Sequence, residues 1–181
     1  NGIIIPLNNC LPTISYNISK DCMIKANENL LSIINSSEIK IVVIALTWDH
    51  KYLIDKSYNI VKNQPDIFLA SSLYDLVLDL RKYGKKSIVI GPISLPEYNF
   101  SSVVSRNIYF ERNIKFKTFN NFKEFEFKYH NIFKYLANKE HLTLLKPHEI
   151  QCKDNLHCNF LIDGKSIFSD DNHLSKHGSL I

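Results

Sequence analysis

The sequence lacks the patterns that mark several common classes of binding protein. Its 181 residues include five glycines, and these do not form the pattern of a nucleotide-binding loop, so we expect no nucleotide cofactor. The longest apolar run, residues 41–46 with their neighbours, is far too short to cross a bilayer. No charged segment followed by an apolar one opens the chain, so we expect a soluble chain without a signal peptide. A start at Asn1 indicates an excised piece or a chain whose beginning was not seen.

The positive charge of the chain is mild and dispersed. The formal net charge is +4, and the lysines are spread without an arginine-rich block, which suits anionic glycans or membrane surfaces better than nucleic acid. Aromatic residues alternate with lysine between Tyr109 and Tyr135, as in a base-stacking surface. However, the apolar positions there recur at helical spacing, which predicts a buried helix face and solvated lysines. These positions are Phe122, Phe125, Tyr129, Ile132, Phe133 and Leu136. We therefore predict no nucleic-acid partner.

Strands and helices alternate along the chain, which predicts a parallel sheet covered on both sides by helices. The expected strands lie at 2–6, 40–46, 86–90, 142–145 and 166–168, and the expected helices at 22–35, 69–83 and 122–136. The β-branched run at 40–46 predicts a strand in the middle of the sheet, buried on both faces. The chain has 45% hydrophobic residues and no linker or repeat, so residues 1–181 are expected to form one domain.

The four cysteines fall in two local pairs, Cys10 with Cys22 and Cys152 with Cys158. Local disulfides are the economical interpretation, and they would place the chain in an oxidising compartment such as a bacterial periplasm. A metal site with His148 and His157 near the second pair is the alternative. Cys10 and Cys22 are too widely spaced for a second zinc knuckle, so we favour disulfides and predict no metal.

The most informative stretch lies near the end of the chain, where Asp170 stands three residues ahead of His173. The carboxylate can hold the Nδ1–H of the imidazole and leave Nε2 free to take a proton from a hydroxyl nucleophile, as in two thirds of a catalytic triad. The competing interpretation is structural: residues 169–172 read Ser-Asp-Asp-Asn, which is also typical of the N-terminal cap of a helix.

The segment IFSDDNHLSKHG, residues 167–178, resembles the Asp-x-x-His block of SGNH (GDSL-type) hydrolases, in the form found in SGNH domains fused to acyltransferase family 3 membrane proteins. The resemblance implies a flavodoxin-like three-layer α/β/α fold with a parallel sheet, in which Asp170 and His173 are catalytic. It also implies a cysteine pair around the segment just ahead of this block. Trp48, after the strand at 40–46, stands near the position of the family's Gly-x-Asn-Asp block, which is absent here. Trp48 is equally well read as a core aromatic.

Asn9 lies in a loop after the first expected strand, where ligands collect in open α/β sheets. We therefore assign Asn9 and Trp48 to the substrate or oxyanion region. With no Gly-x-Asn-Asp asparagine, backbone N–H groups are expected to carry more of the oxyanion stabilisation.

The Gly-Asp-Ser block that carries the family's nucleophile does not occur in the 181 residues. Because the first strand and helix of the fold are missing as well, we expect the N-terminal part of the domain and its serine to lie upstream of Asn1. A member that has lost the serine is the alternative.

The resemblance implies transfer of an acyl group, most simply acetyl, to a cell-surface polysaccharide through an acyl-serine, without a metal or other cofactor. A fused membrane domain would deliver the acyl group to the periplasmic face of a bacterial inner membrane. Three alternatives stay open: an esterase or deacetylase of the same fold, a non-catalytic glycan-binding module, and a disulfide-stapled scaffold whose lysine-rich helix face contacts a membrane partner. His50 and His177 are expected to be surface histidines.

Overall fold

The structure is a computed structural model that describes residues 5–7, 10–111 and 115–180. The chain divides into two compact units. Unit 1 comprises residues 1–91 and 129–145, and unit 2 comprises residues 92–128 and 146–181. The expected strand at 2–6 falls mostly outside the described residues, and residues 5–7, which are described, are not in a strand.

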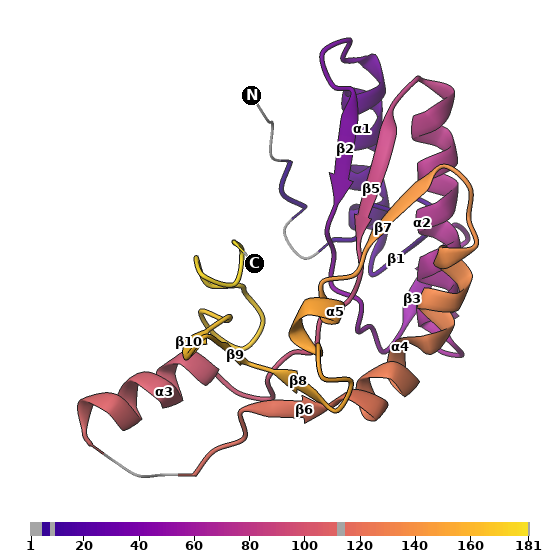
Figure 1. Ribbon diagram of the computed structural model, residues 1–181. Helices are drawn as coiled ribbons and strands as arrows, with labels where there is room; N and C mark the ends of the chain where they lie inside the picture. Colours follow the sequence, from indigo (N-terminus) through magenta and orange to yellow (C-terminus); the bar gives the residue numbers. More distant parts are fainter. Residues whose placement is uncertain (1–4, 8–9, 112–114, 181) are drawn as a thin grey trace. The chain divides into compact units, whose positions relative to one another are not determined.

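The centre of unit 1 is a three-stranded parallel sheet (Figure 1). Its strands are β2 (Ile41–Ile44), β5 (Lys86–Ile90) and β7 (Leu142–Leu145), with β5 in the middle. The register places Val43 beside Ile88 and Ile88 beside Thr143. The parallel sheet expected from the alternation of strands and helices is therefore confirmed.

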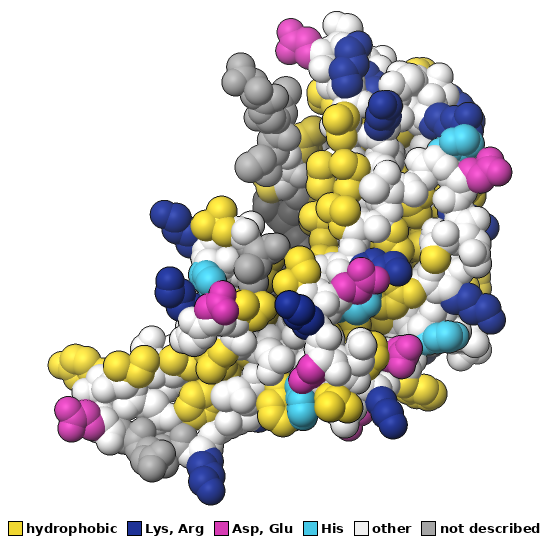
Figure 2. Space-filling view, viewed as in Figure 1, with side chains coloured by type: hydrophobic (Ala, Val, Ile, Leu, Met, Phe, Trp, Pro, Cys, Tyr) yellow, Lys and Arg dark blue, Asp and Glu magenta, His cyan; other side chains and the backbone are white. Residues whose placement is uncertain are grey.

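Strand β2 lies at an edge of the described sheet, so the prediction that it lies mid-sheet and is buried on both faces is wrong. Ile41 and Val43 are 56% and 57% exposed, whereas Ile44 is 5% exposed. Among the described strands, β2 pairs only with β5. One face of β2 is therefore covered, and the other exposes its β-branched side chains. Figure 2 shows hydrophobic side chains gathered over the parallel sheet to which β2 belongs.

Two helices of unit 1 begin and end close to where the sequence predicts. Helix α1 (Lys20–Asn35) begins after Ser19, whose hydroxyl accepts the backbone N–H of Cys22 at 3.2 Å. Helix α2 (Pro65–Lys82) packs against β5. It ends at Lys82, and Gly84, two residues later, has the left-handed φ of 72° that favours glycine after a helix.

The apolar positions at helical spacing in this segment predict a buried face of Met23, Ile24, Leu30, Leu31 and Ile34, and the buried face of α1 differs from it. Its buried residues are Cys22, Met23, Ala26 and Leu30, whereas Ile24 and Leu31 are nearly half exposed. Residues 22, 26 and 30 form one i, i+4 row, and Cys22 is tied down by a disulfide. The buried side of α1 is therefore the side that carries Cys22, and the larger apolar side chains of Ile24 and Leu31 lie partly exposed beside it.

A small antiparallel sheet of unit 1 was not expected from the sequence. It joins β1 (Tyr16–Asn17), β3 (Leu53–Asp55) and β4 (Ile60–Val61) in the order β1-β3-β4. Asn17 is fully buried, and its side-chain amide bonds the N–H and the carbonyl of Leu11. These two- and three-residue strands are too short to leave a periodic pattern in the sequence.

Helix α4 (Phe122–Ala137) confirms the helical reading of the aromatic and lysine-rich segment. Phe125, Tyr129, Ile132 and Leu136 are all at most 7% exposed, as the i, i+3 and i, i+4 spacing predicts. No helix in the described part of the chain is long and apolar enough to cross a membrane.

Unit 2 is built around an aromatic core. Phe160 packs edge to face on Phe100, at 5.3 Å between ring centroids, and on Phe168, at 5.8 Å. Helix α3 (Phe100–Tyr109), which was not expected, supplies Phe100 and is capped by the Asn99 side chain. The other elements of the unit are β6 (Phe119–Asn121), α5 (His148–Gln151), β8 (His157–Asn159), β9 (Leu161–Ile162) and β10 (Lys165–Ser166).

Strands β9 and β10 form a hairpin whose turn is Asp163-Gly164, and an Asp-Gly pair is a strong turn signal in a sequence. Both turn residues have positive φ, 51° and 72°, as a two-residue hairpin turn requires. The strand expected at 166–168 ends earlier, at Ser166. Phe168 instead forms an isolated antiparallel bridge with Leu174, which folds the end of the chain back on itself.

Candidate active site

Asp170 and His173 lie in direct contact in unit 2. The ring Nδ1 of His173 lies 2.8 Å from Oδ2 of Asp170. The other carboxylate oxygen, Oδ1, accepts the backbone N–H groups of Asn172 at 2.9 Å and of His173 at 2.7 Å. Nε2 of His173 has no hydrogen-bond partner among the described residues, and its side chain is 76% exposed. The ring can therefore exchange a proton through Nε2 while Nδ1 is held.

No helix starts at this carboxylate, so the interpretation of residues 169–172 as a helix cap is wrong for the described chain. The residues after Asp170 form bends and turns. Two backbone hydrogen bonds join the segments on either side of this turn. Ser169 N–H donates to the His173 carbonyl at 2.8 Å, and Ser175 N–H donates to the Ile167 carbonyl at 2.9 Å. Asp170 thus stabilises a tight loop whose two ends are bonded to each other.

The carboxylate of Asp170 is held in its ionised form. The backbone N–H groups of Asn172 and His173, followed by the ring of His173, lower the pKa of Asp170 to about 2, because hydrogen bonds to a carboxylate favour its charged state. Asp170 therefore carries its negative charge at neutral pH, which fixes the orientation of the imidazole and stabilises an imidazolium that forms there.

The chain contains a second pair with the same local geometry, which the sequence analysis missed. His157 Nδ1 lies 2.9 Å from Asp154 Oδ2, and Asp154 Oδ1 accepts the backbone N–H groups of Leu156 and His157 at 2.9 and 2.7 Å. The pKa of Asp154 is lowered to about 2 by the same kind of bonds. The repeated Asp-x-x-His spacing is the sequence signal that could have found this second pair. Because both pairs make the same contact, the contact alone does not identify a catalytic pair.

The surroundings of the two pairs differ. The ring of His157 packs against Phe119, with 4.1 Å between ring centroids, and its side chain is 42% exposed, compared with 76% for His173. Leu174, the residue after His173, lines an apolar pocket of unit 2. His173 is therefore the more accessible imidazole, and the residue that follows it lines a pocket.

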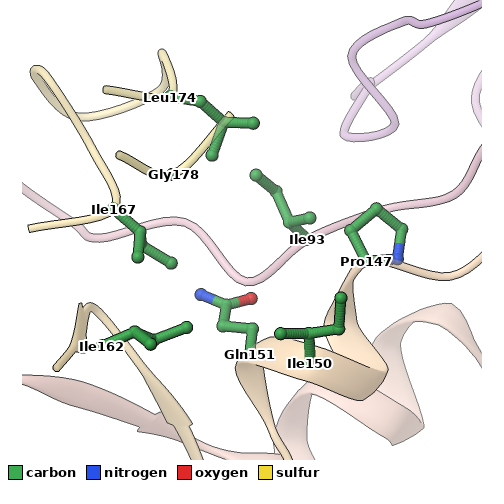
Figure 3. Close-up of a pocket in the computed structure, with 8 residues that line it drawn as sticks. All are labelled: Ile93, Pro147, Ile150, Gln151, Ile162, Ile167, Leu174 and Gly178. Carbon is green, nitrogen blue, oxygen red and sulfur yellow. The ribbon is translucent and has the colours of Figure 1, made fainter. Parts of the chain in front are cut away.

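That pocket is a further feature that the sequence analysis missed (Figure 3). It has a volume of about 50 Å³ and lies within unit 2. Its lining residues are Ile93, Pro147, Ile150, Gln151, Ile162, Ile167, Leu174 and Gly178. They come from several segments that are far apart in the sequence, so no local pattern marks them.

Trp48, one of the two residues expected in the substrate region, belongs to unit 1. Trp48 is 6% exposed, and its indole N–H donates to the Ile90 carbonyl at 3.1 Å. The single donor of the indole is thus used within the unit, and a role for Trp48 in substrate binding stays a prediction. Asn9 lies outside the described residues.

Both expected disulfides are present. Cys10 is bonded to Cys22, and Cys152 to Cys158. The alternative metal site would need thiolates at Cys152 and Cys158, whereas these sulfurs bond each other. Among the described residues, no three His, Cys, Asp or Glu side chains gather in a way that could hold a metal ion.

The two additional histidines of the sequence analysis each contact a backbone carbonyl. His50 Nε2 lies 2.7 Å from the Thr47 oxygen, and His177 Nε2 lies 3.1 Å from the Ile162 oxygen. Both are half-buried. His177 connects the end of the chain to strand β9.

Comparison with known families identifies the chain. Residues 1–181 match the family model described as an SGNH domain fused to AT3 domains. The chain belongs to this family. The family that the Asp-x-x-His segment resembles is therefore confirmed as the family of this chain. A search of curated proteins gives no match.

The fold of this SGNH domain is similar to that of a solved structure, the periplasmic domain of a lipopolysaccharide acetyltransferase from Salmonella ser. Paratyphi A. The TM-score is 0.63 with 14% sequence identity. The match covers 93% of this chain and 64% of the solved one, so the chain spans somewhat less than two thirds of that domain's length.

Proposed function

We propose that this SGNH domain is the acyl-transferring part of a membrane-bound O-acetyltransferase that modifies a cell-surface polysaccharide. The observation that carries the proposal is the contact of His173 Nδ1 with Asp170 in a chain of this family. The carboxylate orients the ring, and the exposed Nε2 serves as the general base and then the general acid.

The nucleophile in this proposal is a serine outside the given residues, which contain no Gly-Asp-Ser block. Its hydroxyl attacks the carbonyl carbon of the acetyl donor while Nε2 of His173 takes the hydroxyl proton. The donor's leaving group departs with that proton, which leaves an acetyl-serine. A sugar hydroxyl then attacks this ester, Nε2 takes its proton, and the serine oxygen leaves and is reprotonated.

The family supports the wider setting that we propose. The acetyl group is delivered by an AT3 membrane domain, and transfer takes place on the periplasmic face of a bacterial inner membrane, where disulfides such as the two present here persist. The complete domain has a flavodoxin-like three-layer α/β/α architecture. Support comes from the parallel order β2-β5-β7 and from the likeness to a domain that is longer than this chain.

A second candidate function, ester hydrolysis, is favoured by the exposure of the pair. The His173 side chain is 76% exposed, so water can reach Nε2 as readily as a sugar hydroxyl. Hydrolysis uses the same two steps, with water in place of the acceptor in the second. The two functions differ in whether an added glycan accelerates the loss of the acetyl-serine.

The test uses the whole protein in membranes, labelled with a serine-reactive fluorophosphonate and assayed with a chromogenic acetate. We expect His173→Ala to abolish both labelling and turnover. His157→Ala is the matched control, because it removes an imidazole with the same contacts, and it should keep both. Equal labelling and turnover in His173→Ala and the wild type would overturn the proposal. Acceleration of turnover by added polysaccharide would distinguish transfer from hydrolysis.

A further inference from the structure

We propose that Ser101, on helix α3, is a positioning residue for His173, because its hydroxyl fixes the peptide unit that holds the backbone of this histidine. The inference rests on the proposed function and adds a residue from a distant segment of the chain to the same site. In the described part of the chain, Ser101 has no hydrogen bond to the side chain of Asp170 or of His173. It therefore acts through the backbone.

The link between Ser101 and His173 is the peptide unit that joins Phe168 to Ser169. Its carbonyl oxygen accepts the Ser101 hydroxyl, and its N–H donates to the His173 carbonyl at 2.8 Å. Because a peptide unit is planar, a hydrogen bond that fixes its carbonyl also fixes the direction of its N–H. Two hydrogen bonds in series therefore connect helix α3 to the backbone of His173.

The Phe168 carbonyl has a second hydroxyl partner, Ser166. The Ser166 Oγ lies 2.7 Å from the Phe168 oxygen and 3.2 Å from the Ser101 Oγ, and Figure 1 shows the beginning of α3 beside β10, which carries Ser166. A carbonyl oxygen has two lone pairs and can accept both hydroxyls. Loss of the Ser101 hydroxyl therefore loosens the peptide unit without leaving its oxygen unsatisfied, which makes Ser101→Ala a mild change.

Of these two hydroxyls, that of Ser101 ties the turn at residues 169–174 to the rest of unit 2. Ser166 is only two residues from Phe168, so it belongs to the same short segment. Ser101 instead lies on α3, next to Phe100, which is fully buried in the aromatic core of the unit. The position of the turn relative to this core consequently depends on Ser101.

The turn of the second Asp-x-x-His pair is held in a different way. The Asp154–His157 pair lies inside the loop that the Cys152–Cys158 disulfide closes. The turn at residues 169–174 contains no cysteine, so hydrogen bonds have to hold it. Its geometry is therefore more sensitive to the loss of one hydroxyl than that of the disulfide-closed loop.

The first measurement is NMR of the chain, with amide hydrogen exchange and the ring 15N signals of histidine as the readouts. In Ser101→Ala, the Ser169 amide should exchange roughly fivefold faster, because its bond to the His173 carbonyl is less well aligned. The ring signals of His173 should move as well. The Asn155 amide donates to the Cys152 carbonyl at 2.9 Å and should exchange as in the wild type. Unchanged exchange of Ser169, or an equal increase at Asn155, would overturn the assignment.

Two further variants separate positioning from a general loss of stability. Ser101→Thr keeps the hydroxyl, so Ser169 should exchange as in the wild type. Ser105→Ala removes an exposed hydroxyl one turn further along α3, which has no hydrogen bond to the residues that the structure describes. This control should change neither Ser169 nor His173. An effect of Ser105→Ala as large as that of Ser101→Ala would overturn the assignment.

The second measurement is turnover of a chromogenic acetate by the whole protein. Ser101→Ala should lower kcat roughly five- to tenfold and leave KM unchanged, because a residue that positions the base affects the chemical step and not binding. Ser101→Thr should keep the wild-type kcat. An unchanged kcat in Ser101→Ala would overturn the positioning role. Faster Ser169 exchange in Ser101→Ala, together with a wild type that turns over no acetate, would instead overturn the proposed function and leave the link between Ser101 and His173 standing.

Discussion

Asp170 holds His173 at two points, because one carboxylate oxygen lies 2.8 Å from the ring Nδ1 and the other accepts the backbone N–H of the same residue at 2.7 Å. The ring and the backbone that carries it are therefore positioned by a single group. A change at Asp170 consequently affects the tautomer of the imidazole and the shape of the turn together, whereas a change at His173 removes only the base.

Asp170→Asn is expected to lower kcat of the whole protein by about 10²–10⁴-fold, because an amide does not fix the required tautomer or stabilise an imidazolium. Turnover of a chromogenic acetate is the measurement. Asp154→Asn alters an equivalent turn and should leave kcat within twofold of the wild type. Equal losses in the two variants would mean that Asp170 acts only on the structure.

The carboxyl groups of Asp170 and Asp154 are each expected to titrate with a pKa of about 2, well below the usual 3.8. A depressed pKa in the folded state adds stability above the unfolded-state pKa, and this contribution is lost as the pH falls from about 4 to 2. The titration is followed by the 13C shifts of the side-chain carboxyls. The unfolding midpoint of Asp170→Asn should fall less than that of the wild type over this range. A midpoint near pH 3.8 for the Asp170 carboxyl would contradict the arrangement.

Gly178→Ala is expected to destabilise the end of the chain by about 1–3 kcal/mol, since the new methyl group would overlap the Ile167 carbonyl and the backbone would have to move. Hydrogen exchange of the Ser175 and Gly178 amides should become faster. Gly164→Asn is a suitable comparison, because that position has a left-handed φ of 72° with open space around it and asparagine tolerates this conformation. Unchanged exchange in Gly178→Ala would show that the close contact relaxes without cost.

Replacement of Cys152 and Cys158 by serine is expected to lower the free energy of unfolding by roughly 2–3 kcal/mol, because the short loop between them is no longer closed in the unfolded chain. Chemical denaturation with and without dithiothreitol measures the effect. The variant should still respond to the reductant through Cys10–Cys22. If the wild type unfolds at the same denaturant concentration in both conditions, neither bond stabilises the fold.

Some parts of this structure could be predicted because the residues concerned determine their own local conformation. Gly84 marks the end of α2 through its left-handed φ, and Asp163-Gly164 marks the β9–β10 turn. Helix α4 could be predicted because its apolar residues keep helical spacing over four turns. The contact of Asp170 with His173 lies within four residues and needs no distant partner.

Other parts depend on contacts that local sequence does not encode. The apolar run of β2 is compatible with a central or an edge strand, and pairing decides between them. The helix cap that was the competing interpretation at Asp170 does not form, because residues 173–175 pair back with residues 167–169. The pocket beside Leu174 is assembled from separate segments, so it becomes visible only when they are brought together.

The outer edge of β2 has a consequence for handling the chain. With no described strand on that side, its backbone N–H and C=O groups form an open row next to the exposed side chains of Ile41 and Val43. Such a row is a template for adding a strand from another molecule. Concentrated preparations of residues 1–181 alone are therefore expected to self-associate through β2, and a charged residue in place of Val43 should keep them monodisperse.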